Sequence, residues 1–335
     1  MGLMEASAGF ALDPKQFLGI PVALIGAAFL SIGAQLQHHG VAKVEAETES
    51  SGSGLSVNQL KRLLARPSWV TGTLMLGLAI AFQLAALYLS AIIVVQPLGA
   101  VSLVITAILN ARVSKTPLNR SSIVAIILCV GGVAAFVLVA VFAAGAGSPN
   151  VTDGQLLLIL AILGAVLILL GLLFVLFRQR FNAVMYIIAA GVLYGFVATL
   201  AKVALARISQ RDADWYLVLC VVGILIAAIL GAYFVQNAYS TGPPDLVIAG
   251  LTVIDPVVGV TIGIVILGEA SQAPWWTTVL FVVFGLVAVR GVFLLAKHHP
   301  QAGGQPDVEG DTGNAGKTTP GVSPESGRSV EGGLD

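Results

Sequence analysis

The chain has 335 residues, of which 57% are hydrophobic and only 10% are charged, and its formal net charge is zero. Because soluble globular domains carry about 25% charged residues, this composition predicts a polytopic membrane protein. The neutral, patch-free charge balance argues against a nucleic-acid partner. The two cysteines, Cys129 and Cys220, lie in apolar runs without metal-ligand or disulfide spacing.

Apolar stretches long enough to cross a bilayer, which takes about 20 helical residues, occur nine times. The sequence therefore predicts an all-α bundle with a transmembrane domain over residues 17–296, a short N-terminal segment over 1–16 and a disordered tail over 297–335. The nine stretches are Phe17–Gln37, Ser68–Leu89, Ala91–Ala111, Ser121–Ala144, Gln155–Phe177, Ala183–Ala206, Trp215–Tyr239, Leu246–Leu267 and Trp275–Ala296.

Lysine and arginine gather on one side of these spans, and such loops face the cytoplasm. With nine crossings, this charge bias predicts an outer N-terminus and an inner C-terminus. The expected location is the inner or plasma membrane. The cytoplasmic set comprises Lys43, Lys61, Arg62, Arg66, Arg112, Lys115, Arg120, Arg178, Arg180 and Lys297, against Lys15, Arg207 and Arg211 on the other side.

Two spans are interrupted by a proline that follows a polar residue. Gln96-Pro97 lies in the third span and Asp255-Pro256 in the eighth. Residues 17–144 and 183–296 therefore resemble two repeats, and an offset of five crossings gives them opposite orientations. Inverted repeats with interrupted helices at matching positions point to the binding site of a transporter.

Asp255 is the main candidate for a functional side chain. A carboxylate near the bilayer centre is disfavoured by roughly 2.5–3.5 kcal/mol on insertion scales, so it is retained mainly for function. Pro256 would free the carbonyl of Thr252, four residues earlier, and add a second polar group. This polar notch indicates a solute pathway, although a protonated acid bonded to a neighbouring helix is the alternative.

Other polar residues in or near the spans could line the same pathway. These are the amides Gln35, Gln83, Gln96, Gln236 and Asn237. Interhelical hydrogen bonding is the alternative role for such amides. Glu269, at the outer end of the eighth span, could act as a gate or contact a cation. Lys202 lies near a helix end, where snorkelling would explain it.

Several of these motifs resemble the drug/metabolite transporter (DMT, EamA-like) superfamily, and within it the NIPA-type magnesium transporters. They are Val95-Gln96-Pro97-Leu98-Gly99-Ala100, Gly191-Val192-Leu193-Tyr194-Gly195 with Ala201-Lys202, Asp255-Pro256 and Ile266-Leu267-Gly268-Glu269. The resemblance covers residues 17–296 and implies an inverted-repeat bundle of nine or ten helices that transports without ATP hydrolysis. The chain departs from it at Val113-Ser114-Lys115, where many relatives carry a Gly-Glu pair.

The hypothesis is a secondary transporter that moves a small organic solute or cation by alternating access, with proton-coupled efflux. Magnesium transport is one alternative. A lipid or lipid-linked sugar flippase, or an accessory subunit of a cell-envelope complex, is another. No enzyme, ATPase or cofactor motif occurs, so we expect neither catalysis nor a cofactor. The expected partners are the solute or ion and the lipid bilayer, and a homodimer is left open.

Overall fold

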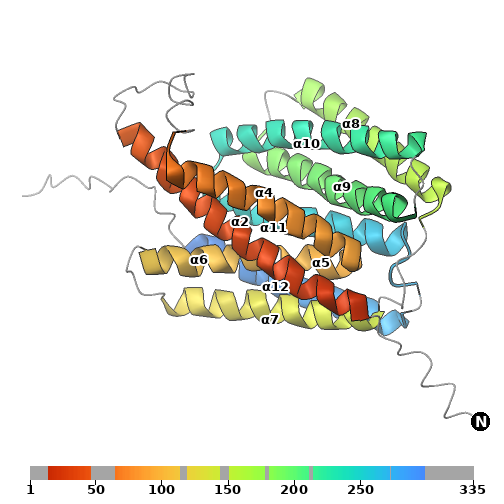
Figure 1. Cartoon of the computed structure of the whole chain (residues 1–335), viewed down its shortest axis with the longest axis horizontal. Coiled ribbons are helices and arrows are strands. Elements are labelled where there is room, and N and C mark those ends of the chain that lie inside the picture. The colour runs from red at the N-terminus through yellow and green to blue at the C-terminus, as the bar shows by residue number, and fades with distance from the viewer. Residues whose placement is uncertain are drawn as a thin grey trace, which may run out of the picture. The chain divides into compact units, whose positions relative to one another are not determined.

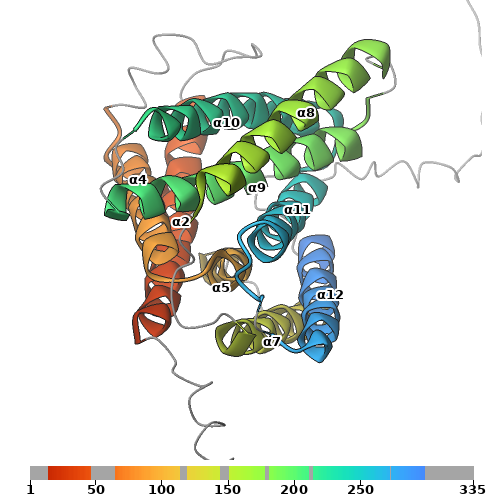
Figure 2. The same ribbon diagram turned by 90° about the vertical axis from the view of Figure 1, so that its right-hand side faces the viewer.

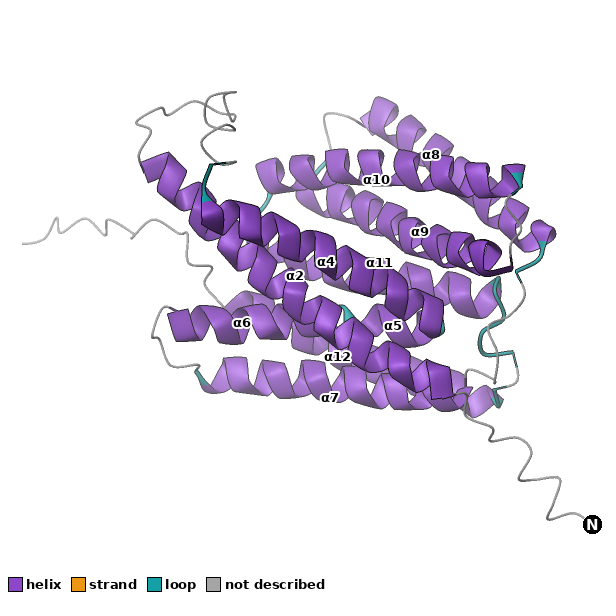
Figure 3. Cartoon of the chain, viewed as in Figure 1, coloured by secondary structure: helices purple, strands orange, loops and turns teal. Residues whose placement is uncertain are grey.

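The computed structural model describes residues 14–46, 65–113, 119–143, 151–177, 181–210, 214–271 and 273–298. Across these ranges the chain is helical with short turns and contains no strand (Figure 3). Nine segments in the described ranges are long and apolar enough to cross a membrane. The predicted all-α polytopic membrane fold is thus confirmed.

The helices follow the predicted order closely. The first one is longer than its predicted apolar stretch, and the third span is divided between two helices. The helices are α2 (Pro14–Ala46), α4 (Pro67–Leu89), α5 (Ile92–Leu98), α6 (Val101–Val113), α7 (Arg120–Ala143), α8 (Asp153–Phe177), α9 (Ala183–Gln210), α10 (Trp215–Thr241), α11 (Pro244–Val265) and α12 (Trp275–His298) (Figure 1). The tail predicted to be disordered lies outside the described residues from position 299 onward, as do residues 1–13.

The two proline-bearing spans differ in continuity. The third span breaks at Gly99-Ala100, where Gly99 and Ala100 donate to the carbonyls three residues earlier, at 3.1 and 3.2 Å. Proline has no N–H to continue the helical ladder, and the tighter turn takes up the interruption. α11, in contrast, runs unbroken through Pro256. A proline at matching positions therefore gives a broken helix in one half and a continuous one in the other.

Helices at corresponding positions of the two predicted repeats have corresponding neighbours. α2 packs along α4 and contacts α6, whereas α9 packs along α10 and contacts α11. In addition, α5 contacts α11 and α7 packs along α12, so the third and fourth spans meet their counterparts (Figure 2). Two similar halves related by a twofold axis would pair in this way, while the repeat boundaries themselves stay a prediction.

Small residues allow the close approach of α7 and α12. A Cβ atom on Gly291 would lie 2.3 Å from the backbone nitrogen of Cys129, and one on Gly132 would lie 2.6 Å from that of Ala288. Within a membrane, where lipid tails are as apolar as leucine, such backbone proximity is a main source of helix association.

Candidate functional site

The crossing of α5 and α11 buries the Gln96 side chain. Gln96 is 4% exposed, and its amide rests on Gly259, where an added Cβ would lie 3.0 Å from Nε2. Within the described residues, Gln96 Nε2 has no hydrogen-bond partner. A buried donor in this state is unusual in native proteins and calls for an explanation.

Asp255 lies one helical turn before Gly259 on α11. Its Oδ1 is also buried without a hydrogen-bond partner among the described residues. The unpaired donor of Gln96 thus rests on α11 one helical turn away from the residue that carries the unpaired acceptor, Asp255. Both residues that precede the prolines in the sequence thus have an unsatisfied side-chain atom, and Arg207 Nε, at the ends of α8, α9 and α10, is the third such atom among the described residues.

α9 supports Asp255 from the other side. A Cβ on Gly191 would lie 2.6 Å from Ile254 Cβ, and one on Gly195 would lie 3.1 Å from the Asp255 carbonyl oxygen. Tyr194 lies between these two glycines on α9. Sequence reasoning did not single out Tyr194, although it is part of the Gly191–Gly195 motif.

An apolar cavity of about 350 Å³ lies on the opposite face of α11. Pro97 and Pro256 both line it, but Gln96 and Asp255 do not. Its α11 residues recur with helical spacing on one face, at Thr252, Val253, Pro256, Val257, Val260, Thr261 and Ile264. The two prolines therefore line an apolar chamber, whereas Gln96 packs on Gly259 of α11 and the Asp255 backbone lies where α9 approaches α11.

Glu269 caps the N-terminus of α5. Its Oε1 accepts the Ile92 N–H at 2.8 Å and its Oε2 accepts the Ile93 N–H at 3.0 Å. Burial raises the pKa of the Glu269 carboxyl, and the two N–H donors and the charge of Lys202 oppose that rise. A carboxylate at a helix N-terminus satisfies orphan N–H groups and complements the helix dipole.

Lys202 caps the preceding helix in the complementary way. Its Nζ donates to the carbonyl of Leu87 and, at 2.7 Å, to that of Ser90, at the end of α4. Lys202 is only 5% exposed. The interpretation of Lys202 as a snorkelling side chain is therefore wrong, because its ammonium turns inward to backbone carbonyls. The tight turn at Ser90-Ala91 is thus held on both sides by ionisable residues from the second half.

The four remaining amides lie on helices other than α5 and α11. Gln35 donates to Asn110 and so joins α2 to α6. Gln83 is half-buried on the α4 face that Gly26 of α2 approaches. On α10, Gln236 is exposed, while Asn237 donates to the Tyr233 carbonyl one turn earlier at 2.7 Å. None of these contacts is with Gln96 or Asp255.

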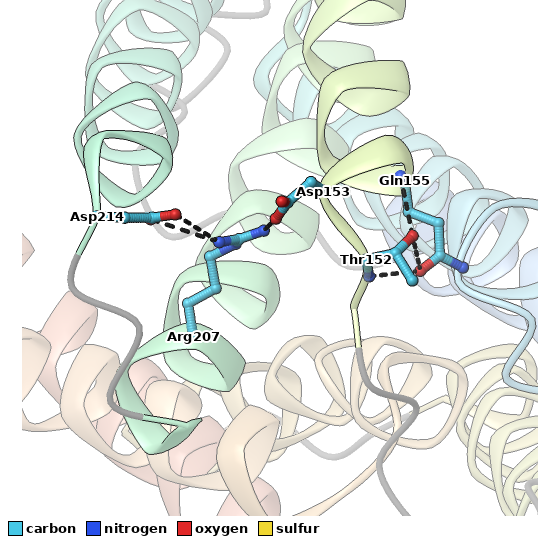
Figure 4. A network of polar contacts seen from close by, with 5 residues as sticks. All are labelled: Thr152, Asp153, Gln155, Arg207 and Asp214. Carbon is cyan, nitrogen blue, oxygen red and sulfur yellow. Dashed lines mark hydrogen bonds and ion pairs between the residues drawn. The ribbon is translucent and has the colours of Figure 1, made fainter.

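A polar network at the predicted outer ends of α8, α9 and α10 was not foreseen from the sequence (Figure 4). Arg207, which is 3% exposed, pairs with Asp153 and Asp214, and its guanidinium lies 5.0 Å from the Tyr216 ring centre. The sequence offered Arg207 only as a loop charge. Because its carboxylate partners come from other helices, no local pattern identifies the network.

Among the described side chains, no group of three or more His, Cys, Asp and Glu residues lies close enough together to hold a metal ion. Asp255 and Glu269 belong to different environments, since both Glu269 oxygens accept backbone N–H groups of α5, whereas Asp255 Oδ1 has no partner among the described residues.

Comparison with known proteins gives a relative but no function. No family profile and no solved structure matches the sequence. An uncharacterised protein of Corynebacterium glutamicum is 25% identical over 284 residues, which cover 84% of this chain and 96% of the relative. The similarity thus extends over nearly the whole length of that protein.

Proposed function

We propose that this protein is a secondary transporter of the plasma membrane, which moves a small organic solute or cation outward in exchange for protons. The pair of unpaired polar atoms at the α5–α11 crossing, Gln96 Nε2 and Asp255 Oδ1, carries the proposal. Leaving a donor and an acceptor unsatisfied inside a membrane is unfavourable unless a solute or proton binds them in part of a cycle. The resemblance to the DMT superfamily supports the same reading.

Alternating access needs an element that can rearrange, and the broken third span supplies one. α5 has only seven residues, carries Gln96-Pro97, and contacts α11 across the two predicted halves. Movement of α5 against α11 would change the surroundings of Asp255 and Gln96 together. Proton binding at Asp255 would then depend on whether the crossing is open to the cytoplasm or to the outside of the membrane.

The proposal is tested with the full chain in liposomes under an imposed pH gradient, using tetraphenylphosphonium and a panel of small amines as solutes. Wild type should accumulate at least one solute, and Asp255→Asn should lower the rate by about tenfold or more, the factor equivalent to about 1.4 kcal/mol. Asp214→Asn is the matched control, because it removes a carboxylate charge near the outer end of α10. Equal rates for wild type and Asp255→Asn at every pH would remove Asp255 from the mechanism.

A flippase for lipids or lipid-linked sugars is the second candidate, and the apolar cavity beside Pro97 and Pro256 favours it. A flippase needs an apolar chamber for the lipid tail next to a polar site for the head group. The cavity lies along one face of α11, and Asp255 lies on another face of the same helix. Transfer of a fluorescent phospholipid between leaflets of the same liposomes distinguishes the two candidates. An accessory-subunit role would instead predict neither activity, with full function retained in Asp255→Asn.

Magnesium transport stays as a third possibility that rests on the NIPA resemblance alone. Magnesium sites usually take one or two carboxylates and keep several waters. The hydrogen bonds of Glu269 to α5 favour a structural role for that carboxylate over a magnesium contact. Growth of a magnesium-uptake-deficient host on limiting magnesium, with and without this chain, is the direct test.

A further inference from the structure

We infer that the cavity between α7, α11 and α12 binds the hydrocarbon chain of a membrane-dissolved amphiphile, which enters sideways from the bilayer. The inference rests on the proposed function and narrows its substrates to molecules with an apolar tail.

The composition of the wall excludes a polar occupant. The lining is formed almost wholly by valine, isoleucine, leucine, phenylalanine, alanine and proline, with three threonines as the polar exceptions. Two of these hydroxyls are already used within α11, since Thr252 donates to the Ile248 carbonyl at 2.7 Å and Thr261 to that of Val257 at 2.6 Å. A bound water needs two to four polar partners, and apolar cavities of this kind stay dry.

The position of the opening identifies the source of the occupant. The floor of the cavity includes the buried residues Val133 and Phe136 of α7. Its outer rim is formed by Val257 of α11 and by Val282 and Leu286 of α12, whose side chains are 52%, 56% and 62% exposed. Val257 and Leu286 lie near the middle of their spans, Leu246–Val265 and Trp275–Lys297. The rim therefore faces the hydrocarbon core of the bilayer, which contains acyl chains and little else.

The fold also connects this cavity to the polar crossing. Pro97 and Pro256 belong to the cavity wall, and each directly follows one of the unpaired polar residues, Gln96 and Asp255. A chain seated in the cavity would press on the two helices that carry those groups. Binding of a tail on one face of α11 can thus bias the polar side chains on the other.

The test uses the full chain in lipid nanodiscs that contain a phosphatidylcholine with a photoactivatable diazirine in its acyl chain. We expect crosslinks in wild type to concentrate on the cavity residues of α11 and α12. Gly285→Leu should fill the cavity, because Gly285 lines it and an added Cβ would meet only the Phe136 ring at 3.9 Å. Crosslinking there should be largely lost, because the leucine side chain occupies the space that the acyl chain would fill.

Gly131→Leu is the matched control, since a Cβ on this exposed α7 glycine meets nothing within 4 Å. A graded series, Gly285→Ala and Gly285→Val, separates cavity filling from misfolding. If the side chains fill the cavity, crosslinking should fall stepwise with side-chain size while the melting temperature stays unchanged. Crosslinks spread evenly over the lipid-facing helix α8, or the same yield in Gly285→Leu as in Gly131→Leu, would overturn the inference. Crosslinking does not require transport, so Asp255→Asn should keep the cavity labelling. Failure of the transport proposal would instead appear in the liposome flux assay, independently of the crosslinking result.

Discussion

At the scale of single residues, the two buried ionisable groups Lys202 and Glu269 act on the ends of two helices. Lys202 satisfies carbonyls at the end of α4, and Glu269 satisfies N–H groups at the start of α5. Truncation of Glu269 removes the acceptors of the buried Ile92 and Ile93 N–H groups. Each such group costs about 1–3 kcal/mol.

Glu269→Ala should therefore destabilise the protein by about 2–5 kcal/mol, because the Ile92 and Ile93 N–H groups lose their acceptors. Glu269→Gln keeps one amide oxygen as an acceptor and should lose less than half of that amount. Thermal unfolding in detergent, followed by tryptophan fluorescence or size-exclusion chromatography, measures both. Equal melting temperatures for Glu269→Ala and wild type would show that the cap contributes nothing.

The charges of Lys202 and Glu269 interact, so their substitutions should not be additive. Removing one member of a buried charge pair strands the other charge, whereas removing both does not. Lys202→Met with Glu269→Gln should thus destabilise the protein less than the sum of the two single changes. The same unfolding measurements on the two single variants and the double variant give a double-mutant cycle. Strictly additive losses of unfolding free energy would mean that the two caps are independent.

At the scale of helices, close packing through glycine sets the geometry of the bundle. Gly291→Val should disrupt the α7–α12 contact, since its Cβ would lie 2.3 Å from the Cys129 backbone nitrogen, which cannot move aside. Overpacking of this kind typically costs about 1–3 kcal/mol, and backbone clashes cost more. Gly131→Val, on the open side of α7, should be tolerated. A comparable loss of folded protein in both variants would contradict this account of the packing.

The sequence predicted the helices well and their faces poorly. Nine spans could be recognised because a bilayer demands about 20 apolar residues for each crossing. Pro97 and Pro256 look equivalent in the sequence, yet only the third span breaks, at Gly99-Ala100, while α11 continues through Pro256. The face of α11 to which Asp255 belongs, and the inward turn of Lys202, also depend on partners far away in the chain.

At the scale of the whole molecule, nine crossings and the charge bias predict opposite sides for the α6–α7 and α9–α10 loops. Ser121 and Ser209 are both exposed near these loops, and the native thiols of Cys129 and Cys220 are buried. A membrane-impermeant maleimide should therefore label Ser209→Cys in intact cells, and Ser121→Cys only after permeabilisation. The reverse pattern would invert the predicted topology.

Movement of α5 against α11 is the central claim, and a disulfide across their crossing tests it most directly. A Cβ on Gly263 would lie 2.4 Å from Ile92 Cγ2, so Ile92→Cys with Gly263→Cys brings two thiols together without removing Gln96 or Asp255. The account predicts that oxidation stops proton-driven flux in liposomes, that reduction restores it, and that neither single variant responds to oxidation. Undiminished flux through fully cross-linked protein would contradict it.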